Sequence, residues 1–174
     1  MVALDVEGLG GFSNNDRLLR DLRWFNGGHR LRLRTGGDFV EVALQHRHRF
    51  LSLDALVFTN LQREHIESHG SFEKYAAAKF RIGKALAASS KRPRAIIANA
   101  DDPQSAPYLA LPVEEKLPFS YAEAKDAVLG SGTAIFTYEG VRFSLQLPGS
   151  FSIMNALAVI KAAHFAGVPL PKIA

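Results

Sequence analysis

The fold class is decided by residues 54–70, which read DALVFTNLQREHIESHG. The segment begins as a short apolar run of the strand type. It ends in a polar stretch that contains two histidines, two glutamates and an arginine. A pattern typical of an amphipathic helix follows at once. A buried strand that leads into a charged loop and then a helix is the arrangement with which open α/β sheets form ligand sites. The segment therefore predicts an α/β fold with a ligand site at the end of this strand.

The rest of the chain alternates between strand and helix patterns. Short apolar runs predict strands at residues 39–44, 54–59, 95–98 and 117–121. Helices are predicted at residues 71–88, 106–109 and 153–166, the first capped by Ser71 and the last ending at Gly167. A hairpin around Glu139-Gly140 is predicted for residues 133–138 and 141–147. We therefore expect a mostly parallel sheet flanked by helices, to which the hairpin adds an antiparallel edge.

Composition narrows the class of protein and of partner. A chain of 174 residues with a normal apolar share fits one globular domain. The formal net charge of +4 comes largely from scattered arginines, which form either a solvated basic face or a surface for anionic ligands such as nucleotides. The chain has no cysteine, no apolar run that could cross a bilayer and no signal-peptide pattern at its start. We expect a cytoplasmic monomer that binds neither nucleic acid nor membranes.

Lys79 is the first candidate for chemistry. It falls within the apolar stripe of the predicted helix at residues 71–88, between Tyr75 and Ile82. Lysine is almost never buried without a partner. Either the ammonium reaches the rim of the apolar surface, or the lysine is desolvated, with a lowered pKa, and open to reaction or modification.

His65 is the second candidate. A lone histidine is most often structural, but Glu64, Glu67 and His69 lie within two turns of His65. Imidazole and carboxylate groups suit magnesium, manganese or zinc to different degrees. The spacing matches no standard zinc motif, so the residues alone leave the structural and metal-binding interpretations open.

Two further polar groups follow predicted strands or turns. The segment Asn99-Ala100-Asp101-Asp102-Pro103 follows a strand, and it fits either ordinary turn chemistry or a nucleotide site at the carboxyl end of that strand. Asn155 lies early in the last helix, where its amide either caps locally or binds an adenine edge.

Four segments in this order resemble the central domain of the Mur ligases, in particular the UDP-N-acetylmuramoyl-dipeptide ligases that add the third peptide residue. They are Val57–His65, His69–Lys79, Asn99–Pro103 and Leu147–Asn155. The resemblance covers about residues 38–174 and implies a fold like that of the P-loop NTPases. Residues 1–37 give no clear prediction, so we expect a poorly readable N-terminal segment followed by a partial central domain.

The resemblance implies an ATP- and magnesium-dependent reaction. Such ligases phosphorylate the carboxylate of a UDP-N-acetylmuramoyl-peptide, and the amine of an amino acid then attacks the acyl phosphate to form an amide. Lys79 matches a family lysine that is carbamylated, which would explain a buried lysine because its tip becomes anionic and faces magnesium. His65 matches a magnesium ligand, and Glu41 is similar to the acidic ligand on the preceding strand.

The resemblance also implies residues that bind nucleotide and substrate. Asn60 matches a residue near the nucleotide phosphates, and the motifs near adenine and ribose contain Asn99, Asp102 and Asn155. The segment Gln45-His46-Arg47 is similar to a family motif whose glutamine and arginine contact the UDP-sugar substrate.

The chain departs from the family pattern in ways that bear on activity. The family's Gly-x-x-Gly-Lys-Thr/Ser phosphate loop is absent, and Ser150 and Ser152 stand where arginine and asparagine are common. The pattern is that of a central domain truncated at both ends. We therefore expect the isolated chain to be inactive or very weak, since that loop supplies much of the charge stabilisation in phosphoryl transfer. The alternative is a non-catalytic remnant that binds nucleotide or has a structural role.

Overall fold

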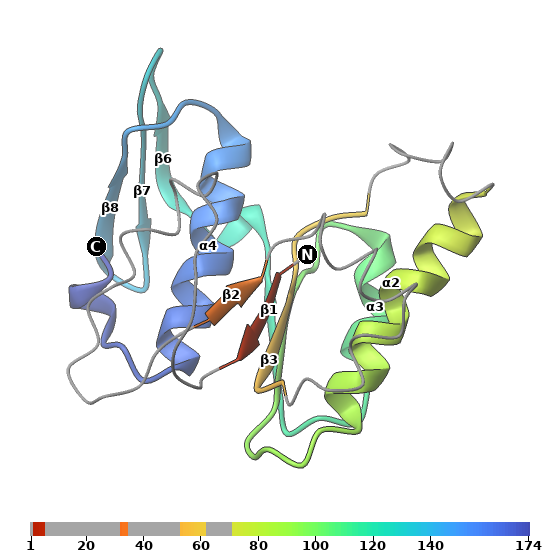
Figure 1. Cartoon of the computed structure of the whole chain (residues 1–174). Helices are drawn as coiled ribbons and strands as arrows, with labels where there is room; N and C mark the ends of the chain where they lie inside the picture. Colours follow the sequence, from red (N-terminus) through yellow and green to blue (C-terminus); the bar gives the residue numbers. More distant parts are fainter. Residues whose placement is uncertain (1, 6–31, 35–52, 62–70) are drawn as a thin grey trace.

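The described part of the chain forms two β-sheets with a helix between them (Figure 1). The computed structural model describes residues 2–5, 32–34, 53–61 and 71–174. The larger sheet has five strands in the order β2-β1-β3-β4-β5, and the smaller sheet has the order β6-β7-β8. The strands are β1 (Val2–Asp5), β2 (Arg32–Arg34), β3 (Ala55–Phe58), β4 (Ala95–Asn99), β5 (Glu115–Phe119), β6 (Lys125–Leu129), β7 (Ala134–Tyr138) and β8 (Val141–Leu145).

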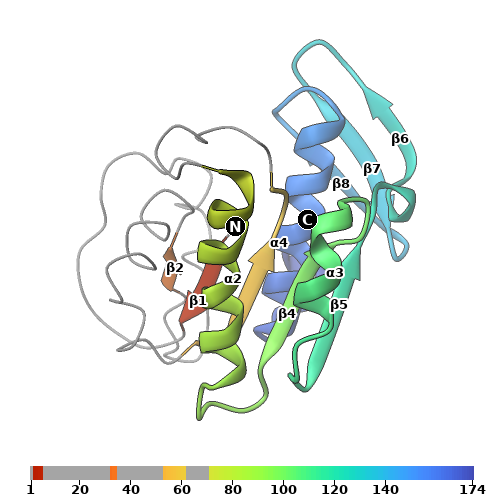
Figure 2. The same ribbon diagram turned by 90° about the vertical axis from the view of Figure 1, so that its right-hand side faces the viewer.

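The parallel core of the larger sheet confirms the predicted α/β class. Strands β3, β4 and β5 run parallel, whereas β1 pairs with β2 and β3 in the antiparallel direction. Helices α2 (Phe72–Ala87) and α3 (Ala106–Leu109) cover one face of this sheet, and α4 (Ser150–Phe165) covers the other (Figures 1 and 2). Short 3₁₀ turns complete the structure at η3 (Pro103–Ser105), η4 (Tyr121–Glu123) and η5 (Leu170–Lys172).

The central strand β3 is apolar on both sides because helices cover both faces of the sheet. Ala55 and Val57 belong to the core shared with α4, while Leu56 and Phe58 belong to the core under α2 and α3. All four side chains are buried. The near-continuous apolar run that predicted this strand is thus explained by its central place in the sheet.

Helix α2 begins where the sequence predicts. Ser71 is its N-cap, and the Ser71 hydroxyl oxygen accepts a hydrogen bond from the backbone N–H of Lys74 at 3.3 Å. Glu73 lies in the first turn, where a negative charge favours the helix dipole. The helix ends at Ala87, one residue before the predicted end. The Ser71 cap sets the start of α2, which comes directly after the segment that follows β3.

The predicted hairpin is confirmed, but its place in the fold is not the one expected. Glu139 and Gly140 both have positive φ values, 46° and 78°, as the tight turn between β7 and β8 requires. The hairpin does not form an edge of the larger sheet; it joins β6, which the sequence did not predict, in the second sheet. The reason is α4, whose apolar side chains contact both sheets, so the hairpin covers the outer side of that helix.

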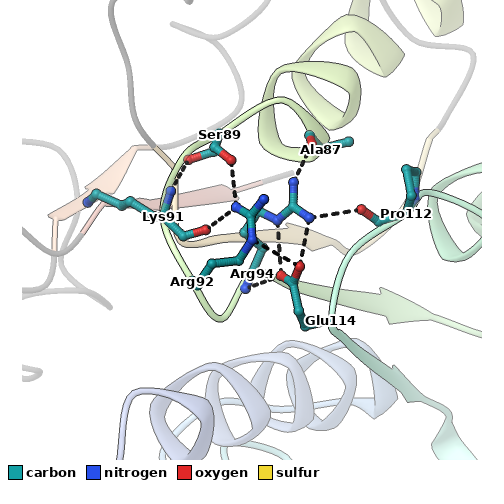
Figure 3. Close-up of polar contacts among 7 residues, drawn as sticks. All are labelled: Ala87, Ser89, Lys91, Arg92, Arg94, Pro112 and Glu114. Carbon is teal, nitrogen blue, oxygen red and sulfur yellow. Dashed lines mark hydrogen bonds and ion pairs between the residues drawn. The ribbon is translucent and has the colours of Figure 1, made fainter.

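Strand β5 begins two residues earlier than predicted because an ion pair between the buried Arg94 and the exposed Glu114 sets its start. The Glu114 carboxylate accepts hydrogen bonds from Arg94 Nε at 3.0 Å, Arg94 NH2 at 2.7 Å and the Arg94 backbone N–H at 2.8 Å (Figure 3). Arg94 also donates to the carbonyl oxygens of Ala87 and Pro112. The hydrogen bonds from Arg94 lower the pKa of Glu114 to about 2. The polar residues Glu115 and Lys116 therefore belong to the strand.

Candidate functional site

The carboxyl ends of three parallel strands bring the predicted polar residues to one edge of the larger sheet. Because β3, β4 and β5 are parallel and neighbours, the segments that follow them lie side by side. Residues 59–61 follow β3, residues 100–103 follow β4, and residues 120–121 follow β5. Asn60 and Asp102 are half-buried at this edge.

A network of side-chain to backbone hydrogen bonds joins these segments. Asn99 Nδ2 donates to the Thr59 carbonyl oxygen at 2.9 Å. The Asp102 carboxylate accepts from the Leu61 N–H through Oδ2 at 2.9 Å and from the Gln104 N–H through Oδ1 at 2.8 Å. Two residues separated from the β3 segment by some forty positions thus fix the backbone on both sides of Asn60.

Asp101 extends the same network to β5. Its carboxylate oxygen Oδ2 accepts a hydrogen bond from the Tyr121 N–H at 2.8 Å, and its own N–H donates to Asn99 Oδ1 at 2.9 Å. Sequence reasoning assigned no separate role to Asp101. The run of Asn, Asp and Pro after a buried strand signals a turn, but it does not identify which carboxylate contacts which neighbouring strand end.

Lys79 is buried on α2, as its place in the apolar stripe predicts. The residue is only 8% exposed, between the buried side chains of Tyr75 and Ile82. Its Nζ lies 4.7 Å from the centre of the Tyr75 ring, a distance at which the ring face attracts a cation. The contact with Tyr75 is a finding that the sequence did not predict, and the structure leaves open whether the ammonium reaches the rim of the apolar surface or the side chain is modified.

Asn155 lies on the opposite face of the sheet from Lys79. It belongs to α4, which packs against β3, β4 and β5 on the side away from α2 (Figure 2). Asn155 is half-buried, and Phe151 in the same first turns of the helix is 62% exposed. Gly149 precedes the helix with a φ of 85°, and the side chain of Ser152 donates to the Pro148 carbonyl oxygen at 2.7 Å. Lys79 and Asn155 therefore belong to helices on opposite faces of the sheet.

The remaining predicted site residues, Glu41, Gln45, Arg47 and His65, lie outside the described residues. The predicted strand at residues 39–44 lies outside them as well. Within the described part, no three His, Asp or Glu side chains are close enough together to hold a metal ion. Of the three predicted magnesium ligands, Lys79 is the one that belongs to the described residues. Among the described helices, none combines the length and apolar character needed to span a bilayer.

Comparison with known proteins identifies the family. Residues 40–163 match the family described as the Mur ligase middle domain, and the chain belongs to this family. The Mur ligases are ATP-dependent ligases. The predicted resemblance is thus confirmed for most of the chain, including the segments that carry the strand-edge residues.

Individual relatives agree with this assignment. The UDP-N-acetylmuramyl-tripeptide synthetase of Roseiflexus sp. is 34% identical over 140 residues, which cover 70% of this chain and 27% of the relative. The UDP-N-acetylmuramoyl-L-alanyl-D-glutamate–2,6-diaminopimelate ligase of Halalkalibacterium halodurans is 31% identical over 137 residues, 73% of this chain and 28% of the relative. The chain therefore spans a little over a quarter of the length of these curated relatives.

A solved structure supports the fold. The crystal structure of MurF from Acinetobacter baumannii superimposes with a TM-score of 0.58 at 17% identity and covers 75% of this chain and 30% of that one. At this level of identity the likeness concerns the fold alone.

Proposed function

We propose that this chain is the nucleotide-binding part of an ATP-dependent ligase that joins the carboxylate of a UDP-N-acetylmuramoyl-peptide to the amine of an amino acid. The observation that carries the proposal is a buried lysine, Lys79, on α2, the helix that follows β3. In the same fold, the segments after β3 and β4 are joined by amide and carboxylate side chains. Family membership supports it independently.

The proposed reaction places different demands on the residues of this chain. ATP with magnesium would supply the phosphoryl group that activates the substrate carboxylate. Asn60, at the carboxyl end of β3, would lie near the phosphates, and Asn155 would lie near the nucleoside. The turn after β4, which contains Asn99 and Asp102, would belong to the same nucleotide-binding site. Lys79 as a carbamate would present an anionic tip to magnesium. Its buried position favours this modification, because the magnesium ion would then compensate the charge at the tip of the side chain.

Further roles are proposed, from the sequence pattern alone, for residues that lie outside the described part. His65 and Glu41 would act with Lys79 as magnesium ligands, because imidazole and carboxylate groups coordinate divalent cations. Gln45 and Arg47 would bind the UDP-sugar substrate. We also propose that residues 38–174 form one partial middle domain.

The carbamate is tested by the mass of the native protein near neutral pH with bicarbonate. We expect an added mass of one carbon dioxide that is lost in Lys79→Ala. Lys84→Ala is a matched control, because Lys84 lies on the same helix with Nζ 5.5 Å from the ring centre of Phe80 but is exposed. An added mass that survives Lys79→Ala, or no added mass in the unaltered chain, would contradict the proposed modification.

A second function is favoured by one specific observation. The 174 residues contain no Gly-x-x-Gly-Lys-Thr/Ser phosphate loop, whose lysine and backbone amides stabilise the transferred phosphoryl group. The chain would then bind nucleotide without turning it over, or serve a structural role. Calorimetry with ATP and magnesium, together with ADP release in the presence of UDP-N-acetylmuramoyl-dipeptide, separates the cases. Rapid ADP release coupled to amide formation by this chain alone would refute the non-catalytic function.

A further inference from the structure

The turn at residues 99–102 connects the ends of three strands, and its side chains do so by hydrogen bonds to the backbone. The Asn99 amide uses its NH₂ group on the Thr59 carbonyl and its oxygen on the Asp101 N–H. Both carboxylate oxygens of Asp102 accept backbone hydrogen bonds, one from Leu61 and one from Gln104.

These hydrogen bonds restrain the orientation of both side chains, which works against turning either of them toward the nucleotide. An asparagine recognises an adenine edge with its NH₂ group and its carbonyl oxygen at the same time. In Asn99 both groups already hold backbone partners at 2.9 Å. Turning the amide toward a base would break the exposed bond to the Asp101 N–H and the partly buried bond to the Thr59 carbonyl, and the loss of the second is costly.

The bonds instead converge on the backbone that carries Asn60. The Thr59 carbonyl and the Leu61 N–H lie on either side of Asn60, and each is held by a different side chain of the turn. The two contacts come from positions 40 and 41 residues away, so they fix the end of β3 relative to the end of β4.

We propose that Asn99 and Asp102 are positioning residues that hold Asn60 toward the phosphates and do not themselves contact the nucleoside. The part that concerns phosphate rests on the proposed function. Under this proposal, loss of Asp102 weakens binding at the phosphate end of the nucleotide and leaves the nucleoside end unchanged.

The first test measures amide hydrogen exchange by NMR in the intact chain. Asp102→Asn keeps the size of the side chain but can accept only one of the two backbone hydrogen bonds. We expect the Leu61 amide, or the Gln104 amide where the new NH₂ group faces Gln104, to exchange about tenfold faster in this variant, in line with the loss of one hydrogen bond.

Asp101→Asn is the matched control, since Asp101 contacts Tyr121 rather than the β3 segment. The Leu61 amide should exchange at the unaltered rate in that variant. A second variant, Asn99→Asp, retains an acceptor for the Asp101 N–H but removes the donor to the Thr59 carbonyl. It keeps the test decisive if Asp102→Asn does not fold. Unchanged exchange at residues 60 and 61 in every folded variant of Asn99 and Asp102 would overturn the positioning role.

The second test separates positioning from direct contact by titrating two probes, adenosine and magnesium tripolyphosphate. Positioning predicts that Asp102→Asn weakens tripolyphosphate binding about tenfold and changes adenosine binding less than twofold. Direct contact predicts the opposite pattern, with adenosine weakened and the Leu61 exchange rate unchanged, and that result would overturn the proposal. If the unaltered chain binds neither probe, the proposed nucleotide function fails, and the exchange measurement still decides whether the turn holds the β3 segment.

Discussion

Replacing Tyr108 with phenylalanine is expected to stabilise this protein. Tyr108 lies on α3 and is 2% exposed. Its ring packs between Phe58, at 4.6 Å between ring centres, and Phe80, at 5.2 Å in an edge-to-face arrangement. The Tyr108 hydroxyl has no hydrogen-bond partner among the described residues. The substitution removes that hydroxyl and retains both ring contacts.

The magnitude follows from the cost of an unsatisfied polar group. A buried hydroxyl without a partner costs about 1–3 kcal/mol relative to the unfolded chain, where water satisfies it. Because some relaxation is expected, we predict that Tyr108→Phe raises the free energy of unfolding by about 1 kcal/mol. For a protein of this size, that corresponds to an increase in Tm of roughly 2–4 °C.

The pKa of Tyr108 adds a dependence on pH. Burial, followed by the nearby Tyr75, raises the pKa of Tyr108 in the folded state above its ordinary value of 10.0. The folded protein therefore favours the protonated phenol, and this stabilisation is present below pH 10.0 and is lost as the pH rises beyond it. The variant lacks this loss, so its advantage over the unaltered chain should grow above pH 10.0.

Tyr138→Phe is the matched control, because the chemical change is the same at a tyrosine whose hydroxyl has partners. Tyr138 is 6% exposed; burial and then Glu139 raise the pKa of its hydroxyl while Lys161 opposes that rise, so the hydroxyl interacts with both side chains. That substitution should lower the free energy of unfolding by about 0.5–1.5 kcal/mol. Urea unfolding followed by circular dichroism measures both variants. The reasoning is refuted if Tyr108→Phe destabilises the protein as much as Tyr138→Phe does.

Three further substitutions test the ion pair, the end of α4 and the core. The pKa of Glu114 is about 2 in the folded protein against an ordinary 4.5, so its contribution to the free energy of unfolding is present above pH 4.5 and is lost as the pH falls toward 2. The urea midpoint of Glu114→Gln should therefore vary less over this pH range than that of the control, Glu115→Gln. Gly167 has a φ of 89°, so Gly167→Ala should cost about 1 kcal/mol in thermal unfolding, while Gly132→Ala, in open space, should be near neutral. Leu157 is fully buried, and Leu157→Ala should cost about 2–5 kcal/mol in urea unfolding; a loss below 1 kcal/mol would contradict the assigned core.

Much of the fold could be predicted because its signals are local. The apolar run of β3 and the N-cap at Ser71 lie within short stretches of sequence, as does the glycine that ends α4. That glycine, Gly167, has a positive φ, and its N–H and that of Val168 donate to the carbonyl oxygens of His164 and Ala163, which completes the helix end. Each of these features depends on residues only a few positions apart, so the sequence carries them directly.

The errors have a different origin. Strand β6 begins with polar residues and contains Asp126, which has a φ of 51°, at an irregularity in its pairing with β7. Its pattern is therefore weak, and its existence depends on the partner strand. The start of β5 was shifted because Glu114 and Arg94, 20 residues apart, set it through an ion pair.

For the candidate site, the sequence by itself determined which residue types follow each strand and that Lys79 falls on the buried side of its helix. These results depend on helix and strand periodicity, which short segments fix. Only the tertiary structure decided that the hairpin joins a second sheet across α4 and that Asp102 holds the Leu61 N–H. The physical reason is that such contacts join residues tens of positions apart, and their geometry exists only after parallel strands have aligned their carboxyl ends at one edge of the sheet.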